Sequence, residues 1–158
     1  MYRGMKLFFY IVLIIFSDSC KSAKPIVSPR DVSKDDSLLI SLEKTACYGT
    51  CPEYSLTIYR SGRTIYEGKR HVEKIGNFEK KISEKEVKEL IKAFEEAEFF
   101  NLLNEYVEQI SDFPTTFLSF NYEGKSKKIK DYYGAPEKLK KLEKIVENIG
   151  KDDGWEKK

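Results

Sequence analysis

A strand–turn–strand–helix pattern occurs twice in this chain, and it restricts the fold more than any other sequence feature. In the first copy, residues 38–43 and 54–58 alternate apolar and polar side chains, which is the period-two pattern of a half-buried strand. Ser61-Gly62 follows as a two-residue turn, and residues 63–69 return as the second arm of a hairpin. The folded part therefore begins with antiparallel strands.

The first helix has a clear start signal. Val72 and Ile75 extend the hairpin arm or begin a third strand, which Gly76 ends. Ser83 and Glu86 then form a capping box, in which both side chains satisfy backbone N–H groups at the start of a helix. Apolar residues recur at helical spacing and form one stripe: Val87, Leu90, Ile91, Phe94 and Ala97.

The second copy repeats this order. Residues 116–122 alternate, residues 123–124 form a turn, and residues 125–132 return with four lysines, which suits an exposed edge strand. Pro136 opens a second helix and Gly150 closes it. Its apolar stripe is Leu139, Leu142, Ile145, Val146 and Ile149.

These patterns predict an α+β fold with β-ββα-ββα order. We expect an antiparallel sheet of about five strands with two helices on one face, because one face of the sheet can bury both apolar stripes. The domain should span residues 37–150. Residues 20–36 are too polar to offset their ordering entropy and should form a flexible tether. Residues 151–158 should be a disordered tail, with Trp155 loose or on the surface.

The N-terminus predicts export. Residues 1–19 have the form of a signal peptide, with basic Arg3 and Lys6 before an unbroken apolar run from Leu7 to Phe16. A helix needs about 20 apolar residues to cross a bilayer core, so this run is too short for a permanent anchor.

Cys20 is the predicted lipidation site. Ser17-Asp18-Ser19-Cys20 resembles the lipobox of bacterial lipoproteins, in which the cysteine is acylated and becomes the first mature residue. Ser17 and Asp18 depart from the Leu and the small apolar residue that the lipobox prefers. The alternative is an ordinary secretory signal that leaves Cys20 as a thiol. Lys21, with no acidic run after it, favours the outer membrane, with the domain facing the periplasm.

The charge balance argues against nucleic acid as a partner. The chain has 28 basic and 26 acidic side chains, and removal of Arg3, Lys6 and Asp18 with the signal leaves 26 and 25. Nucleic-acid binding needs a basic face or stripe, and attraction to anionic lipids needs a polybasic cluster. The membrane contact we predict is therefore the lipid on Cys20.

The motif Cys47-Tyr48-Gly49-Thr50-Cys51-Pro52 carries the remaining cysteines. Two nearby thiols in an exported protein normally oxidise, which makes a structural disulfide the simplest interpretation. A redox couple is less well supported, since thiol oxidoreductases use Cys-x-x-Cys at a helix N-terminus and here a strand follows. Structural zinc wants four ligands, and once Cys20 is assigned to the lipid only Cys47, Cys51 and His71 remain as soft donors.

Other candidate site residues are few. His71 is the only histidine, and its basic strand context favours a solvent-facing sheet position. Asp112 lies in a loop before Pro114, where an aspartate more often caps the local backbone than acts in a site. Several of the ten tyrosines lie on predicted strands, where aromatic residues are common.

The segment from Leu42 to Tyr54, which contains the cysteine motif, resembles the opening of domain-of-unknown-function family 6438, found in bacterial envelope proteins and lipoproteins. Gly62, Gly76, Asp112 with Pro114, and residues 131–136 add to a resemblance that covers about residues 38–149. Lys44 departs from the arginine expected there. The resemblance implies a fold and an envelope location. It implies no activity and transfers no catalytic residue.

These observations together predict a lipid-anchored periplasmic domain that acts as a non-catalytic binding or interaction module. The candidate binding surface is the sheet face or edge opposite the helices, near Tyr48, Gly49 and Asp112. We predict no catalytic residue, cofactor or metal ligand, and an envelope protein is the candidate partner. The alternative is an envelope thiol-disulfide redox protein that uses Cys47 and Cys51.

Overall fold

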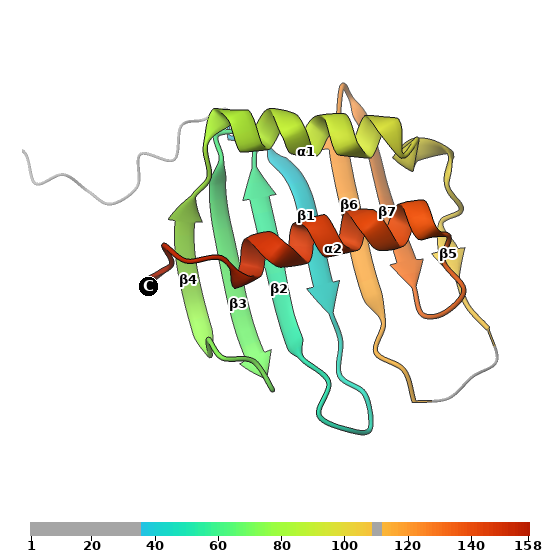
Figure 1. Cartoon of the computed structure of the whole chain (residues 1–158), viewed down its shortest axis with the longest axis horizontal. Helices are drawn as coiled ribbons and strands as arrows, with labels where there is room; N and C mark the ends of the chain where they lie inside the picture. The colour runs from blue at the N-terminus through green and yellow to red at the C-terminus, as the bar shows by residue number, and fades with distance from the viewer. Residues whose placement is uncertain (1–35, 109–111) are drawn as a thin grey trace, which may run out of the picture. The chain divides into compact units, whose positions relative to one another are not determined.

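A twisted eight-stranded sheet forms the frame of the protein (Figure 1). The structure, a computed structural model, describes residues 36–108 and 112–158. The strand order is β5-β7-β6-β1-β2-β3-β4-β8, in which β5 and β7 are parallel and all other neighbours are antiparallel. The strands are β1 (Leu38–Lys44), β2 (Glu53–Tyr59), β3 (Arg63–Arg70), β4 (Gly76–Lys81), β5 (Glu105–Tyr106), β6 (Thr116–Tyr122), β7 (Lys125–Asp131) and β8 (Glu156–Lys157).

The predicted sheet of about five antiparallel strands was wrong in strand number and in strand direction. Gly76 was expected to end a strand, but it is the first residue of β4. It takes a positive φ of 104° and pairs with Gly68 of β3. β5 and β8 have two residues each, too few to produce a sequence period. The α+β class is consistent with the structure. β1 lies in the middle of the sheet and joins the two hairpins through β2 and β6.

Both predicted hairpin turns are confirmed. The Gly62 N–H donates to the Tyr59 carbonyl oxygen at 3.0 Å, and a Cβ at Gly62 would lie 2.4 Å from the Ile82 carbonyl oxygen. Glycine is therefore required at this position. Glu123 and Gly124, both at positive φ, connect β6 to β7.

The first helix, α1 (Glu84–Glu96), begins as predicted. The Ser83 hydroxyl accepts from the Glu86 N–H at 3.2 Å, and the Glu86 carboxylate accepts from the Ser83 N–H at 2.7 Å. A short 3-10 helix, η1 (Phe99–Asn101), follows. The second helix, α2 (Glu137–Lys151), starts after Pro136 but runs one residue past Gly150, the predicted end.

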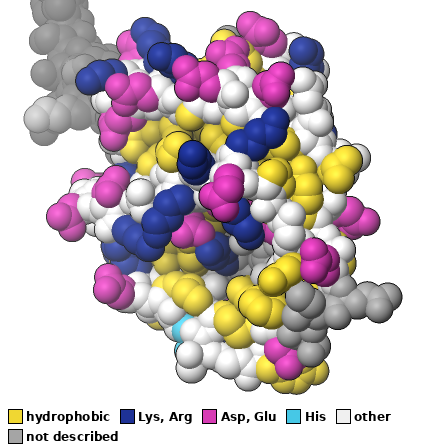
Figure 2. Space-filling view, turned by 45° about the vertical axis from the view of Figure 1, so that its right-hand side comes forward, with side chains coloured by type: hydrophobic (Ala, Val, Ile, Leu, Met, Phe, Trp, Pro, Cys, Tyr) yellow, Lys and Arg dark blue, Asp and Glu magenta, His cyan; other side chains and the backbone are white. Residues whose placement is uncertain are grey.

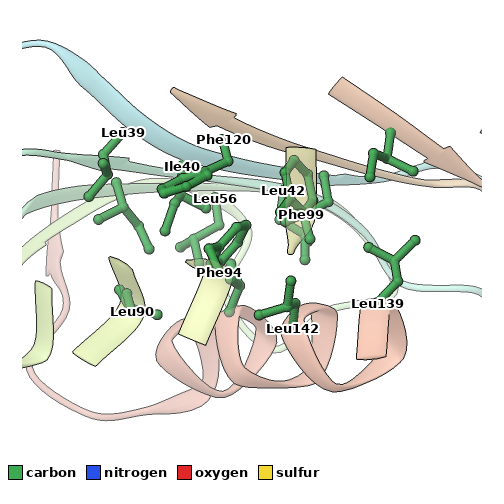
Figure 3. Close-up of a cluster of buried hydrophobic side chains, with 14 of the residues drawn as sticks. Leu39, Ile40, Leu42, Leu56, Leu90, Phe94, Phe99, Phe120, Leu139 and Leu142 are labelled. Carbon is green, nitrogen blue, oxygen red and sulfur yellow. The ribbon is translucent and has the colours of Figure 1, made fainter. Parts of the chain in front are cut away.

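The core lies between one face of the sheet and the two helices, which both cover that face (Figure 1). Phe94 of α1 is fully buried, and its ring centroid lies 4.6 Å from that of Phe120 on β6 and 5.1 Å from that of Phe99 (Figure 3). Leu139 and Leu142 of α2 point toward the same sheet face. The opposite face, with alternate residues such as Ser55 and Thr57 on β2, is covered by neither helix.

The predicted disordered tail was also wrong. β8 pairs with β4 through Glu79 and Glu156, and Lys158 N–H donates to the Asn77 carbonyl oxygen at 2.9 Å. Trp155 packs on the core, with its ring 5.6 Å from Tyr66. The Lys80 ammonium lies 4.7 Å from the Trp155 ring centroid, so a cation–π contact holds a segment whose composition is polar.

Candidate functional site

The loops at one end of the sheet carry most of the predicted site residues. The β1–β2 loop, the segment before β6 and the β7–α2 connection all leave the sheet at this end (Figure 1). Thr45 and Thr115 join the first two: the Thr45 N–H donates to the Thr115 carbonyl oxygen, and the Thr115 N–H donates to the Thr45 hydroxyl, both at 3.0 Å. The β1–β6 pairing thus continues into the loops and fixes one beside the other.

The Cys47–Cys51 disulfide is present in the β1–β2 loop, with its Cα atoms 5.7 Å apart. The Gly49 N–H donates to Cys47 Sγ at 3.3 Å. Tyr48 is 95% exposed at the tip of the loop. Cys51 leads through Pro52 into β2, so the disulfide precedes a strand and has no helix N-terminus directly after it.

Asp112 lies in the segment before β6, with a positive φ of 77°. Phe113 beside it is 47% exposed, and its ring centroid lies 5.5 Å from Tyr133 and 6.5 Å from Tyr132. The Phe113 N–H also donates to the Tyr132 hydroxyl at 3.4 Å. These contacts connect the segment to the residues that follow β7.

Two cavities lie between this end of the sheet and α2, on the helix side of the sheet. The first, which we call the Asp131 cavity, has a volume of about 400 Å³. Its lining combines three lysines, three acids and three aromatic side chains: Lys44, Lys140, Lys144, Asp131, Glu143, Glu147, Phe113, Tyr132 and Tyr133, with Pro114 and Thr116. Figure 2 shows this side of the molecule, where acidic, basic and apolar side chains are interspersed.

Asp131 and Glu143 bring two carboxyl groups into the wall of this cavity. Asp131, at the end of β7, is 4% exposed, and Glu143 of α2 is 6% exposed. The Lys140 ammonium contacts Asp131 Oδ2 at 2.5 Å. Burial alone would lower the pKa of Lys140, but the hydrogen bond and charge of Asp131 outweigh it, so the pKa is raised. The other Asp131 oxygen, Oδ1, and Glu143 Oε1 are buried and receive no hydrogen bond from any other described residue.

Glu143 is the most perturbed acid of the site. Burial, and after it the negative charge of Asp131, raises the pKa of Glu143 to about 8, while Lys140 and Lys44 oppose the shift. A hydrogen bond between Glu143 and Asp131 also favours the protonated form. Two carboxyl groups can share a hydrogen bond only when one carries a proton, so Glu143 is the protonated partner at neutral pH.

The second cavity, which we call the Tyr54 cavity, has a volume of about 460 Å³ and shares Lys44 and Glu147 with the first. These two side chains form an ion pair between β1 and α2. Tyr54 and Tyr66 stack at 5.3 Å between centroids, and burial raises the pKa of Tyr54, helped by the charge of Glu147. Pro52, at the exit of the disulfide loop, also lines this cavity.

His71 does not occupy the predicted strand position. It follows β3 in a turn with a positive φ of 54°, is exposed, and lines the Tyr54 cavity. Within the two described ranges, no group of three or more His, Cys, Asp or Glu side chains is arranged to hold a metal ion. The arrangement at this end of the sheet is suited to binding through charge, hydrogen bonds and aromatic contact.

Sequence reasoning identified the disulfide but missed the two cavities. The predicted surface lay opposite the helices, whereas both cavities lie on the helix side. Lys140 and Glu143 belong to a helix rich in Lys and Glu, which suggests a solvated surface. A signal was nevertheless present, because Glu143 follows Leu139 by four residues and precedes Val146 by three, which places it in the buried stripe.

The N-terminal predictions fall outside the described ranges. The signal peptide, Cys20 and nearly all of the tether lie in residues 1–35 and stay predictions. Neither helix in the described part of the chain is long and apolar enough to cross a membrane.

The chain is therefore an α+β domain with two helices on one face of its sheet. Its disulfide loop lies at the end of the sheet where the two cavities are found. The family model for a domain of unknown function, DUF6438, matches residues 38–150. The chain belongs to this family, as the cysteine-motif resemblance predicted. No curated protein matches the chain.

Proposed function

We propose that the domain is a non-catalytic binding module that recognises its ligand in the Asp131 cavity. The observation that carries this proposal is the pair of buried carboxyl groups of Asp131 and Glu143 in the lining of an open cavity, whose oxygens Asp131 Oδ1 and Glu143 Oε1 receive no hydrogen bond from any other described residue. Buried polar atoms are nearly always hydrogen-bonded, and exceptions concentrate where a ligand or water supplies the partner. A pocket with few convergent polar groups and a perturbed pKa is the usual form of a binding site.

The location we propose is the outer membrane, with the domain facing the periplasm on a lipid attached to Cys20. The signal-peptide and lipobox patterns of residues 1–20 support it. The Cys47–Cys51 disulfide agrees with an oxidising compartment. Mass spectrometry of the protein from membranes tests this location. A diacylglycerol on an N-terminal Cys20 is the expected result, and an intact Met1 or an unmodified Cys20 would contradict it.

Site-specific photocrosslinking in cells tests the binding function. Tyr133 borders the cavity and is 39% exposed, so a photoreactive residue there can reach a ligand or partner. The matched control is the same residue at Glu89, on the solvent side of α1. A defined adduct from position 133 and none from position 89 is expected. Equal adducts at both positions, or none at either, would count against a site in this cavity.

A thiol-disulfide redox role is the second candidate, because the disulfide lies in an exposed loop. The two roles differ in reduction potential. A structural disulfide resists the glutathione pool, whereas a catalytic one equilibrates with it. Full retention of the disulfide in a reducing glutathione buffer would exclude the redox role.

A further inference from the structure

We propose that the Asp131 cavity binds a primary ammonium group on an alkyl stem, held between the carboxyl groups of Asp131 and Glu143. This inference rests on the proposed binding function and names the chemistry of the ligand. The ammonium can belong to a small amine or to a lysine side chain of a peptide. The experiment below separates these two sources.

The two carboxyl groups have hydrogen-bonding capacity that no other described residue uses. Lys140 occupies Asp131 Oδ2, and neither Asp131 Oδ1 nor Glu143 Oε1 receives a hydrogen bond from any other described residue. The hydrogen bond between the two carboxyl groups depends on a proton carried by Glu143. An ammonium has three N–H donors and one positive charge, so it can replace that proton and serve both carboxylates.

Two of the three lysines that line the cavity are already engaged in ion pairs. Lys44 is paired with Glu147, and Lys140 with Asp131. Lys144 is exposed on α2. An anionic ligand placed at the carboxyl groups of Asp131 and Glu143 would have to break one of these pairs and would be repelled by the carboxylate charge. A cationic ligand has to displace only a proton.

The cavity also has aromatic side chains in its wall. Phe113, Tyr132 and Tyr133 line it, with Phe113 within 6.5 Å of both tyrosines between ring centroids. Aromatic faces attract ammonium groups and also cover an alkyl stem. A cavity of about 400 Å³ lies within the range that takes a small ligand.

The exchange has a defined proton balance. The protonated Glu143 carboxyl loses its proton to the solvent, and the ammonium takes its place beside the two carboxylates. The charged groups that act on Glu143 are Asp131 on β7, Lys44 on β1 and Lys140 on α2. The other titratable groups that line the same cavity are Lys144 and Glu147 on α2 and the phenols of Tyr132 and Tyr133. Because binding releases one proton, affinity should rise about tenfold per pH unit below the pKa of Glu143 and level off above it.

The experiment is an NMR titration of the isotope-labelled full chain in a nonionic detergent. The probes are 1,5-diaminopentane and an acetylated, amidated Gly-Lys-Gly peptide. Pentan-1-ol and pentanoate control for the stem and for the opposite charge. The titrations are run between pH 6 and 8.5 on the wild type, on Glu143→Gln and on the matched control Glu89→Gln, which changes an exposed acid of α1.

We expect at least one ammonium probe to shift resonances around the cavity, with affinity that rises with pH. Glu143→Gln should weaken binding at pH 8 by roughly tenfold and remove the pH dependence, whereas Glu89→Gln should do neither. Binding of the diamine alone indicates a small amine as the ligand, and binding of the peptide alone indicates a lysine side chain. Either result, or binding of both, supports the proposal.

Three results would overturn it: no ammonium probe binds, pentanoate binds as well as the amine, or Glu143→Gln binds the amine like the wild type. If these results occur while the photocrosslink from position 133 is still observed, the ammonium proposal fails and the binding function stands. If the crosslink is also absent, both fail.

Discussion

The two helices cover the same face of the sheet, yet their buried stripes differ in chemistry. The buried residues of α1 are Val87, Leu90 and Phe94, all apolar. The buried residues of α2 include Glu143 and Gly150, and the cavities lie beside this helix. The helices also begin differently, with a capping box on α1 and no side-chain cap on α2. The comparison indicates that α1 serves packing alone, whereas α2 combines packing with the lining of the proposed site.

The largest expected effect concerns α1. Phe94→Ala should lower the free energy of unfolding by roughly 3–5 kcal/mol, because it removes a fully buried ring that contacts Phe99 and Phe120 and leaves a void. Urea denaturation measures this change. Glu89→Ala, on the exposed face of α1, is the control and should stay close to the wild type. A loss below about 1 kcal/mol for Phe94→Ala would show that α1 is not the stabilising helix.

The next effect concerns α2 and depends on pH. Glu143 has a folded-state pKa of about 8, above its ordinary value of 4.5. Between these values the folded chain holds a proton that the unfolded chain releases, so the contribution of Glu143 to stability decreases as pH rises. Glu143→Gln removes this dependence. At pH 9 the variant should therefore be more stable relative to the wild type than at pH 4.5, by on the order of a few kcal/mol.

Denaturation of both proteins at a series of pH values tests this expectation. Glu89→Gln serves as the control and should follow the wild type across the range. Parallel curves for the wild type and Glu143→Gln would mean that Glu143 is ionised in the folded protein, and the difference between the helices would then be much smaller.

The disulfide loop next to the cavities gives a smaller effect. Replacement of Cys47 and Cys51 together by Ser should destabilise the domain by about 2 kcal/mol, the value expected for closure of so short a loop. Thermal unfolding of oxidised wild type and double variant measures it. Identical melting temperatures would show that the disulfide is not a structural staple.

The smallest effect concerns the helix starts. Ser83→Ala should cost about 1 kcal/mol, because it removes the acceptor for the Glu86 N–H. Pro136→Ala at the start of α2 should cost less, since Pro136 provides no side-chain cap. Urea denaturation of the two variants compares the two starts directly. An equal loss for both would remove the difference between them.

The sequence predicted the elements that contain many regularly spaced residues. Both helices and both hairpin turns have strong local signals, such as the Ser83–Glu86 capping box and the Glu123-Gly124 turn. β5 and β8 have no such signal, because two residues form a strand only when a neighbouring strand is already in place. The order of Trp155 likewise depends on Tyr66 and Lys80, which are distant in sequence.

The candidate site was less accessible to prediction than the fold. The cysteine spacing was sufficient to propose the disulfide, because the two cysteines are only four positions apart in the sequence. Asp131 and Glu143 meet only because β7 and α2 pack together, and neither differs in type from the surrounding surface acids. The position of Glu143 in the apolar stripe was the one local indication that it is buried.

The central claim is that α2 places a protonated carboxyl group in the wall of the cavity. A carbon-13 NMR titration of the side-chain carboxyl of Glu143 tests it most directly, with Glu89 in the same spectra as an exposed reference. We predict a midpoint near pH 8 for Glu143. A midpoint near 4.5, the ordinary value for glutamate, would contradict the claim.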